Sequence, residues 1–209
     1  NARGIIMKTL LVLLISCFMV VSAFAVIDPD PDMLGIYFDR DAEENCLTVG
    51  TVPFFAYLIL TNPTANAVDA YEFGFLNCVC TGTEQTFFMT ASNIADGVVQ
   101  GIDVGIHTKI EGDYIVGLAE PLMTSPATIL HSWQYLCTAI QPIHMFVYAA
   151  SVPSLPGGLP VVQNADGPVL MTVGLSTGGP DIPVASINAD DCAVAVDHCT
   201  WGDVKALYR

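Results

Sequence analysis

Basic residues are scarce in this sequence. The chain holds 6 Lys and Arg residues against 21 Asp and Glu residues, which gives a formal net charge of −15 at pH 7. A surface of this charge repels nucleic-acid phosphates and anionic lipid headgroups. Nucleic acids and anionic membranes are therefore excluded as partners. The acidity is consistent with solubility outside the cell and with the binding of divalent cations.

Helical periodicity is nearly absent as well. Only the C-terminal end shows it, where Thr200 is predicted to cap a short helix that runs through Lys205 to Tyr208. The remainder consists of short apolar or alternating segments separated by Pro, Gly, Asn and Asp, most densely over residues 151–160. Such a pattern is typical of a sandwich or a barrel. The sequence thus predicts an all-β fold, an antiparallel β-sandwich of the jelly-roll or Ig-like kind, with that short C-terminal helix.

The N-terminal part has the pattern of a leader. An apolar run over residues 10–21 follows Lys8, and Ala23 and Ala25 occupy the positions that a signal peptidase reads. The run is too short for a comfortable membrane span. Residues 1–25 are therefore predicted to be upstream residues plus a secretory signal peptide, and residues 26–209 a single β-sandwich domain. We expect the mature protein to be secreted or held at the cell surface, with no membrane span.

A lipobox-like pattern offers a second way to process this leader. Residues 14–17 end in Cys17, which a bacterial lipoprotein would carry as its lipidated first residue. This alternative is the weaker one, because residues 18–26 are nearly all apolar, whereas a lipid-anchored segment is normally a polar tether.

The other cysteines agree with export. They are even in number, which favours disulfides over thiol ligands in an exported chain. Cys192 and Cys199 are predicted to pair across a short polar turn. The remaining pairings stay open, because six cysteines allow 15 of them. The six cysteines, predicted to form three disulfides, are Cys46, Cys78, Cys80, Cys137, Cys192 and Cys199.

Residues 55–75 predict the core of the domain. An apolar run leads to a polar turn at Asn62, and the alternating segment that follows places Tyr71, Phe73 and Phe75 on one face. We expect two antiparallel strands joined as a hairpin, with the aromatic face directed inward.

This segment resembles the opening strands of cohesin-type β-sandwiches. In those secreted bacterial modules an apolar strand, a polar turn and a strand with Gly and Phe begin a jelly roll, as at residues 55–75 here. Over its full length, including residues 201–209, the chain also resembles uncharacterised exported bacterial proteins. Cohesins bind dockerin modules through one sheet face. The resemblance implies the fold of this domain and assigns no recognition residue in it.

One catalytic motif is present. Residues 174–178, Gly-Leu-Ser-Thr-Gly, have the form of a nucleophile elbow around Ser176, and Asp190, Asp191 and His198 follow in the order found in α/β-hydrolases. The elbow needs a helix directly after the serine, and the sequence Gly-Pro-Asp-Ile-Pro cannot form one. A serine hydrolase is therefore a disfavoured alternative, and no catalytic residue is predicted.

Closely spaced carboxylates make calcium the better candidate ligand. Asp39, Asp41 and Glu43 stand at every second position, and hard oxygen ligands are those that calcium takes. The acidic segment of residues 28–32 repeats this spacing. Neither stretch is an EF-hand loop, because both lack its glycine and its terminal glutamate. The alternative is that both are solvated acidic segments.

Aromatic residues raise a glycan-binding alternative. Trp133, Tyr135 and Tyr148 would form a platform on which sugar rings stack, as in carbohydrate-binding modules. Aromatic side chains in a chain this rich in strands more often belong to the core.

Taken together, these patterns predict a secreted, non-catalytic structural or interaction module. Its partner would be a protein or a glycan. Self-assembly into a surface layer or filament is a second possibility, because strand edges are templates for pairing another chain. The acidic loop of residues 39–45 and the loop of residues 153–160 are the expected places for a site.

Overall fold

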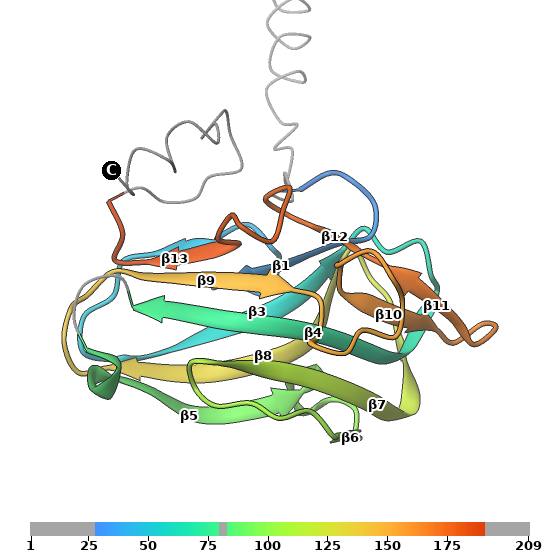
Figure 1. Cartoon of the computed structure of the whole chain (residues 1–209), viewed down its shortest axis with the longest axis horizontal. Coiled ribbons are helices and arrows are strands. Elements are labelled where there is room, and N and C mark those ends of the chain that lie inside the picture. Colours follow the sequence, from blue (N-terminus) through green and yellow to red (C-terminus); the bar gives the residue numbers. More distant parts are fainter. Residues whose placement is uncertain (1–27, 80–82, 191–209) are drawn as a thin grey trace, which may run out of the picture.

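The computed structural model of the chain describes residues 28–79 and 83–190 (Figure 1). Some predictions fall outside these residues: the signal peptide, the lipobox Cys17, Cys80, the pair of Cys192 with Cys199, and the C-terminal helix. These stay predictions. Over the described ranges the chain forms two β-sheets packed face to face, so the predicted all-β sandwich is confirmed.

The first sheet has five strands. Its order is β12-β1-β3-β8-β5. All its neighbours are antiparallel except β12, which runs parallel to β1. The strands are β1 (Met33–Tyr37), β3 (Pro53–Thr61), β5 (Phe87–Ile94), β8 (Ala127–Cys137) and β12 (Gly174–Leu175).

The second sheet has eight strands. The path β11-β10-β4-β9-β13-β2 forms most of it, while β7 pairs with β4 and β6 pairs with β7. The only parallel pair of this sheet among the described residues is β13 with β2. The strands are β2 (Cys46–Leu47), β4 (Ala67–Val79), β6 (Gly101–Asp103), β7 (Glu111–Met123), β9 (Ile143–Tyr148), β10 (Val161–Asn164), β11 (Val169–Thr172) and β13 (Ala185–Ile187).

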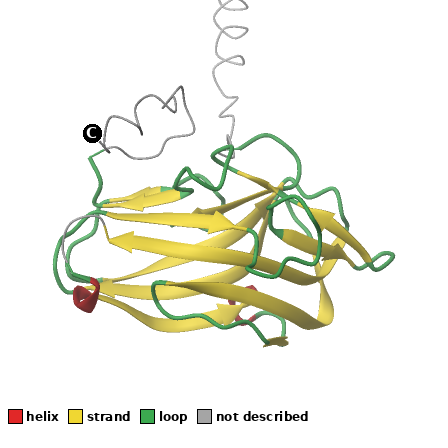
Figure 2. Cartoon of the chain, viewed as in Figure 1, coloured by secondary structure: helices red, strands yellow, loops and turns green. Residues whose placement is uncertain are grey.

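Helical structure in the described part is limited to two short 3₁₀ turns, η1 (Glu84–Thr86) and η2 (Ala95–Gly97) (Figure 2). Each connects to an end of β5. Across residues 28–79 and 83–190, no helix has the length and apolar character that a membrane crossing needs.

The expected hairpin of residues 55–75 is wrong in its pairing. Both strands form where the sequence placed them, but β3 pairs with β1 and β8, whereas β4 pairs with β7, β9 and β10. The turn after Thr61 crosses from one sheet to the other, with Asn62 at a φ of 46°. The apolar faces of β3 and β4 thereby both border the core between the sheets, where the rings of β4 meet those of β8. An alternating pattern does not distinguish this crossing from a hairpin, because both bury the same face.

Aromatic rings fill the space between the sheets. Tyr71, Phe73 and Phe75 of β4 are at most 3% exposed, which confirms that this face is directed inward. The ring of Phe73 stacks on that of Tyr114 with 5.0 Å between centroids, and it meets Trp133 edge-on at 6.2 Å. Such ring pairs stabilise the fold beyond the area that they bury.

The loop after β1 covers the outer face of the five-stranded sheet. Ala42, at a φ of 59°, is fully buried there in a small cluster with Tyr37, Tyr57 and Ile59. The guanidinium of Arg40 lies 5.5 Å from the centre of the Tyr57 ring, a cation–π contact. The acidic loop is therefore part of the packing of the sandwich.

The loop of residues 149–160 is fastened to the outer face of the eight-stranded sheet by two serines. Ser154 donates its N–H and its hydroxyl to the two carboxylate oxygens of Glu72, at 2.6 and 2.7 Å. Ser151 holds the carboxylate of Asp113 in the same way, at 3.1 and 2.5 Å. Because charge-assisted hydrogen bonds are the strong ones, these four contacts fix the start of the loop.

Gly74 is required by the close approach of this loop. A Cβ at Gly74 would overlap the ring of Tyr148 and stand 2.8 Å from the carbonyl oxygen of Ala149. The Tyr148 hydroxyl donates to the Phe75 carbonyl at 2.8 Å, so the ring cannot move aside without losing this bond.

Gly74→Ala is expected to lower the free energy of unfolding by about 1–3 kcal/mol, because the added methyl group forces Tyr148 away from the sheet. Urea denaturation followed by fluorescence measures the change. Gly117→Ala on the neighbouring strand is the matched control, since a Cβ there meets nothing within 4 Å. Equal stability of the two variants would contradict this account of the loop.

Candidate functional site

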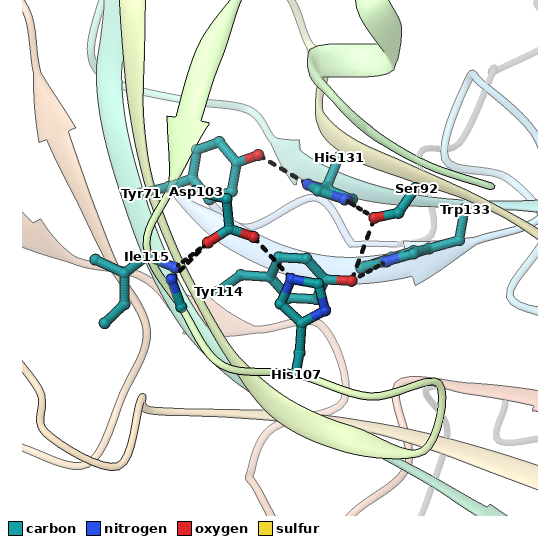
Figure 3. Close-up of polar contacts among 9 residues, drawn as sticks. Tyr71, Ser92, Asp103, His107, Tyr114, Ile115, His131 and Trp133 are labelled. Atoms are coloured by element: carbon teal, nitrogen blue, oxygen red, sulfur yellow. Dashed lines mark hydrogen bonds and ion pairs between the residues drawn. The ribbon is translucent and has the colours of Figure 1, made fainter.

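A cluster of polar side chains lies between the sheets, near the edge formed by β5 and by β6 with β7 (Figure 3). The hydroxyl of Tyr71 is 3.0 Å from Nδ1 of His131, and Oγ of Ser92 is 2.7 Å from Nε2 of the same ring. Nε1 of Trp133 donates to the hydroxyl of Tyr114 at 2.8 Å, and that hydroxyl lies 3.3 Å from Oγ of Ser92. The contact of Ser92 with His131 resembles the nucleophile and base of a hydrolase.

The donors and acceptors around Ser92 leave it without a base. Tyr71 is 3% exposed, so its hydroxyl proton needs an acceptor inside the protein, and Nδ1 of His131 is the acceptor in contact with it. His131 then carries its proton on Nε2 and donates it to Oγ of Ser92. Tyr114, whose hydroxyl accepts from Trp133, donates to the same oxygen, and Ser92 itself is an exposed residue. In this arrangement every buried donor is satisfied, and the imidazole cannot accept the serine proton.

The protonation behaviour of the cluster agrees with a structural role. Burial, with a smaller contribution from His107, lowers the pKa of His131 to about 3. Burial likewise raises the pKa of Tyr71 above its ordinary value. An imidazole with so low a pKa stays neutral at neutral pH and is too weak a base to take the proton of a serine hydroxyl. The polar cluster therefore joins the sheets and does not activate Ser92.

The outer end of the cluster holds β6 in place. The ring of His107 stacks on that of Tyr114 with 3.9 Å between centroids, and its Nε2 lies 2.9 Å from Oδ2 of Asp103. Oδ1 of Asp103 accepts the N–H groups of Gly105 and Ile115, at 2.8 and 3.2 Å. The Asp103 side chain thus points toward the polar cluster and ties β6 to β7.

The nucleophile elbow lacks its structural context. β12 ends at Leu175, and turns and bends occupy the residues from Ser176 to Ile182, so the helix that an elbow requires does not follow. Ser176 is 5% exposed. Asp191 and His198 lie outside the described residues. The geometry gives the hydrolase alternative no support.

One of the three predicted calcium ligands, Asp39, is used within its own loop. The carboxylate of Asp39 accepts the backbone N–H groups of Asp41, Glu43 and Glu44, at distances from 2.8 to 3.3 Å. Asp32 in the other acidic segment similarly accepts the N–H and hydroxyl of Thr64. Within the described ranges, no three acidic, histidine or cysteine side chains are grouped to hold a metal ion. Calcium binding at Asp39, Asp41 and Glu43 stays a prediction.

The aromatic platform is wrong. Trp133 is 1% exposed and Tyr135 is fully buried, because both belong to the inner face of β8. Tyr148 is half-buried beneath its own loop, with its hydroxyl bonded to Phe75. These rings therefore offer no shared flat surface to a sugar.

The cysteines differ in part from the prediction. Cys137 is a free thiol buried in the core opposite Phe87, and burial raises its pKa. No disulfide joins two cysteines that both lie in residues 28–79 and 83–190. The prediction of three disulfides that use all six cysteines is therefore wrong at Cys137, whose free thiol is buried in the core. Cys46 is disulfide-bonded. The sequence left the partners of Cys46 and of Cys78 open, and they stay open.

An exposed apolar surface surrounds β6. Ile102, Val104 and Ile106 occur at every second position, with exposed fractions of 71%, 68% and 87%. Beside them lies an open groove of about 710 Å³ on β4, β7 and β6, lined mainly by small and apolar residues. We call this surface the β6 face. It comprises Ile102, Val104 and Ile106 together with the groove residues Ala70, Ile115 and Gly117.

Register explains how the β6 face forms. Ala70 of β4 is opposite Gly117 of β7, which is opposite Ile102 of β6, so the three side-chain positions lie in one row. Small residues in the two inner strands leave room above the sheet, and the isoleucine at the edge forms a wall. Contiguous exposed apolar surface of this kind marks interaction sites.

The β6 face was not identified from the sequence. The apolar alternation from Ile102 to Ile106 predicts a strand, but a strand's exposed face and its buried face look alike when both are apolar. The glycines among these residues do not mark the exposed face either, because they accompany close backbone approach: a Cβ at Gly105 would lie 2.0 Å from the carbonyl oxygen of Asp113.

Comparisons with known proteins give only distant likenesses. No protein-family model matches the chain, and no curated protein matches its sequence. A cohesin of scaffoldin B from Acetivibrio cellulolyticus, solved in complex with a dockerin, has a TM-score of 0.49 and 6% identity, with 76% of this chain and 98% of that chain covered. A cohesin module of a family 33 glycoside hydrolase from Clostridium perfringens has a TM-score of 0.44 and 10% identity, with coverages of 75% and 98%.

A type II cohesin domain from the cellulosome of Acetivibrio cellulolyticus is similar to the same degree. Its TM-score is 0.44 and its identity 14%, and the match covers 76% of this chain and 96% of that chain. Cohesin modules, which the sequence resemblance named, are thus among the solved structures similar to this one. At such TM-scores and identities the likeness carries no argument about partners or chemistry.

His131 is expected to make stability depend on pH. The unfolded chain takes up a proton on this ring near pH 6.5, whereas the folded chain does so only near pH 3. The contribution of the neutral His131 ring to the free energy of unfolding is therefore fully present above pH 6.5. It is lost as the pH falls from 6.5 toward 3, by up to about 1.4 kcal/mol per pH unit. Urea titrations between pH 7 and pH 5, before most carboxylates titrate, measure the slope.

His131→Gln should make the free energy of unfolding less dependent on pH between 7 and 5. His144→Gln, on the opposite sheet, is the control and should leave that dependence unchanged. Nuclear magnetic resonance of the imidazole provides a direct measurement on the unmodified protein. A titration midpoint of His131 near 6.5 in the folded state would contradict the buried, neutral ring.

Proposed function

We propose that this chain is a non-catalytic module that acts outside the cell and binds a protein partner through the β6 face. The observation that carries the proposal is the row of three apolar side chains, each at least 68% exposed, beside an open apolar groove. Desolvation of such a surface is the main favourable contribution to protein association. The predicted signal peptide supports the extracellular location.

The chemistry of the β6 face favours a protein over a glycan. Sugar rings stack on flat aromatic side chains, and the residues that line this groove are aliphatic, glycine or amide residues. The non-catalytic character is supported by the polar cluster, in which His131 donates to Ser92.

The net charge favours a different protein over a second copy of this chain. At a formal charge of −15, two identical molecules repel each other, and this repulsion opposes a filament or surface layer built from this chain alone.

Replacement of Ile102 by Asp is expected to abolish partner binding without unfolding the protein, since the side chain is 71% exposed. Peptides selected from a displayed random library on the wild-type protein serve as the probe. Their affinity should fall about 30-fold on Ile102→Asp, the loss typical of an interface anchor. Melting temperature, measured in parallel, should change little.

Ile140→Asp is the matched control, because Ile140 is 72% exposed and lies in the loop between β8 and β9. The selected peptides should bind this variant like wild type. Equal losses on both variants, or peptides indifferent to Ile102, would show that the β6 face is not the binding surface.

A further inference from the structure

β6 is an edge strand with one side open. It pairs with β7, and no strand of residues 28–79 or 83–190 pairs with its other side. Along this segment the even-numbered residues bond to β7: Val104 donates to Ile115, Ile106 accepts from Asp113, and Gln100 accepts from Ala119. In a β-ladder the backbone groups of the alternate residues point the other way. The N–H and C=O groups of Gly101 and Asp103 therefore face the open edge.

This edge lacks most of the features that protect natural sheet edges. Protected edges carry lysines, prolines or covering loops. Residues 100–106 hold neither lysine nor proline, and three of their side chains are exposed and apolar. The edge is protected by its shortness, by the inward-pointing carboxylate of Asp103 and by the turn at Gly105, where the N–H group bonds to Asp103.

The two faces of β6 differ in chemistry. Ile102 and Val104 lie on the face toward the groove. Asp103 and His107 lie on the opposite face, toward the polar cluster, where Asp103 is the single carboxylate of the strand (Figure 3). A strand added along this edge would place its own side chains alternately beside the apolar row and beside Asp103.

Charge selects the occupant. The chain carries 21 acidic and 6 basic residues, so an added strand from a second copy would meet like charge. A partner with Lys or Arg would instead meet opposite charge over the surface as a whole.

From these observations we infer that the β6 edge binds by strand addition: an extended partner segment that alternates apolar residues with Lys or Arg continues the sheet beyond β6. This inference rests on the proposed function and adds to it the binding mode and the chemistry of the partner. Main-chain hydrogen bonds at Gly101 and Asp103 supply affinity, and the alternation of side chains supplies specificity.

Short synthetic peptides test the inference on the mature protein. A peptide that alternates Val and Lys should bind, and the matched peptide that alternates Val and Glu should not. N-methylation of the peptide amides that face β6 should weaken binding about tenfold or more, because each removes a donor, while methylation of the other amides should not. Binding should also weaken as salt is raised.

Hydrogen exchange gives a readout at the edge itself. The amides of Gly101 and Asp103 should become protected when the Val and Lys peptide binds, and those of residues 138–142 should not change. Sedimentation equilibrium of the protein alone should show a monomer. A dimer that Ile102→Asp dissociates would overturn the cationic partner in favour of a second copy.

The outcomes separate this inference from the proposed function. Library peptides that depend on Ile102 but tolerate N-methylation at every amide would overturn strand addition and leave the β6 face as the binding surface. Acidic library peptides that depend on Ile102 would contradict the inference that the partner is cationic and leave strand addition standing. Peptides with no dependence on Ile102 would overturn both.

Discussion

The crossing of the chain from β3 in one sheet to β4 in the other is the constraint on which the rest of this structure depends. These adjacent strands belong to different sheets, so the turn at Asn62 brings two apolar faces together and begins the core with a local connection. Phe73 and Phe75 then meet Trp133 and Tyr114 from strands far away in sequence. Any change that turned β3 and β4 into a hairpin would place both in one sheet and separate Phe73 and Phe75 from Trp133, which they meet across the sandwich.

A sandwich that buries several tyrosines and a histidine must satisfy their polar atoms. The cluster around His131 does so by directing donors from Tyr114 and His131 to Oγ of Ser92, an exposed residue of β5. The same contacts that imitate a catalytic pair thus complete the hydrogen bonding of the core near its edge. Asp103 and His107 extend this bonding outward and fix the position of β6.

Outside the core, most of the acidic loops are internally bonded. Asp39 orders its own loop, while Glu72 and Asp113 hold the loop of residues 149–160. The β6 face is different, because its side chains are apolar and uncovered. An acidic molecule with an apolar, open-sided strand edge at β6 is suited to a cationic extended partner and unsuited to its own copies.

The sequence by itself determined that the chain is a β-sandwich and that Tyr71, Phe73 and Phe75 face inward, because alternation along a strand is a local property that burial imposes directly. Only the tertiary structure decided which sheet each strand joins, that Trp133 and Tyr135 are core residues, and that Ser92 meets His131. Tertiary structure also left the apolar alternation at Ile102 uncovered. These features depend on pairing between strands distant in sequence, and the pattern within one strand contains no information about its neighbours.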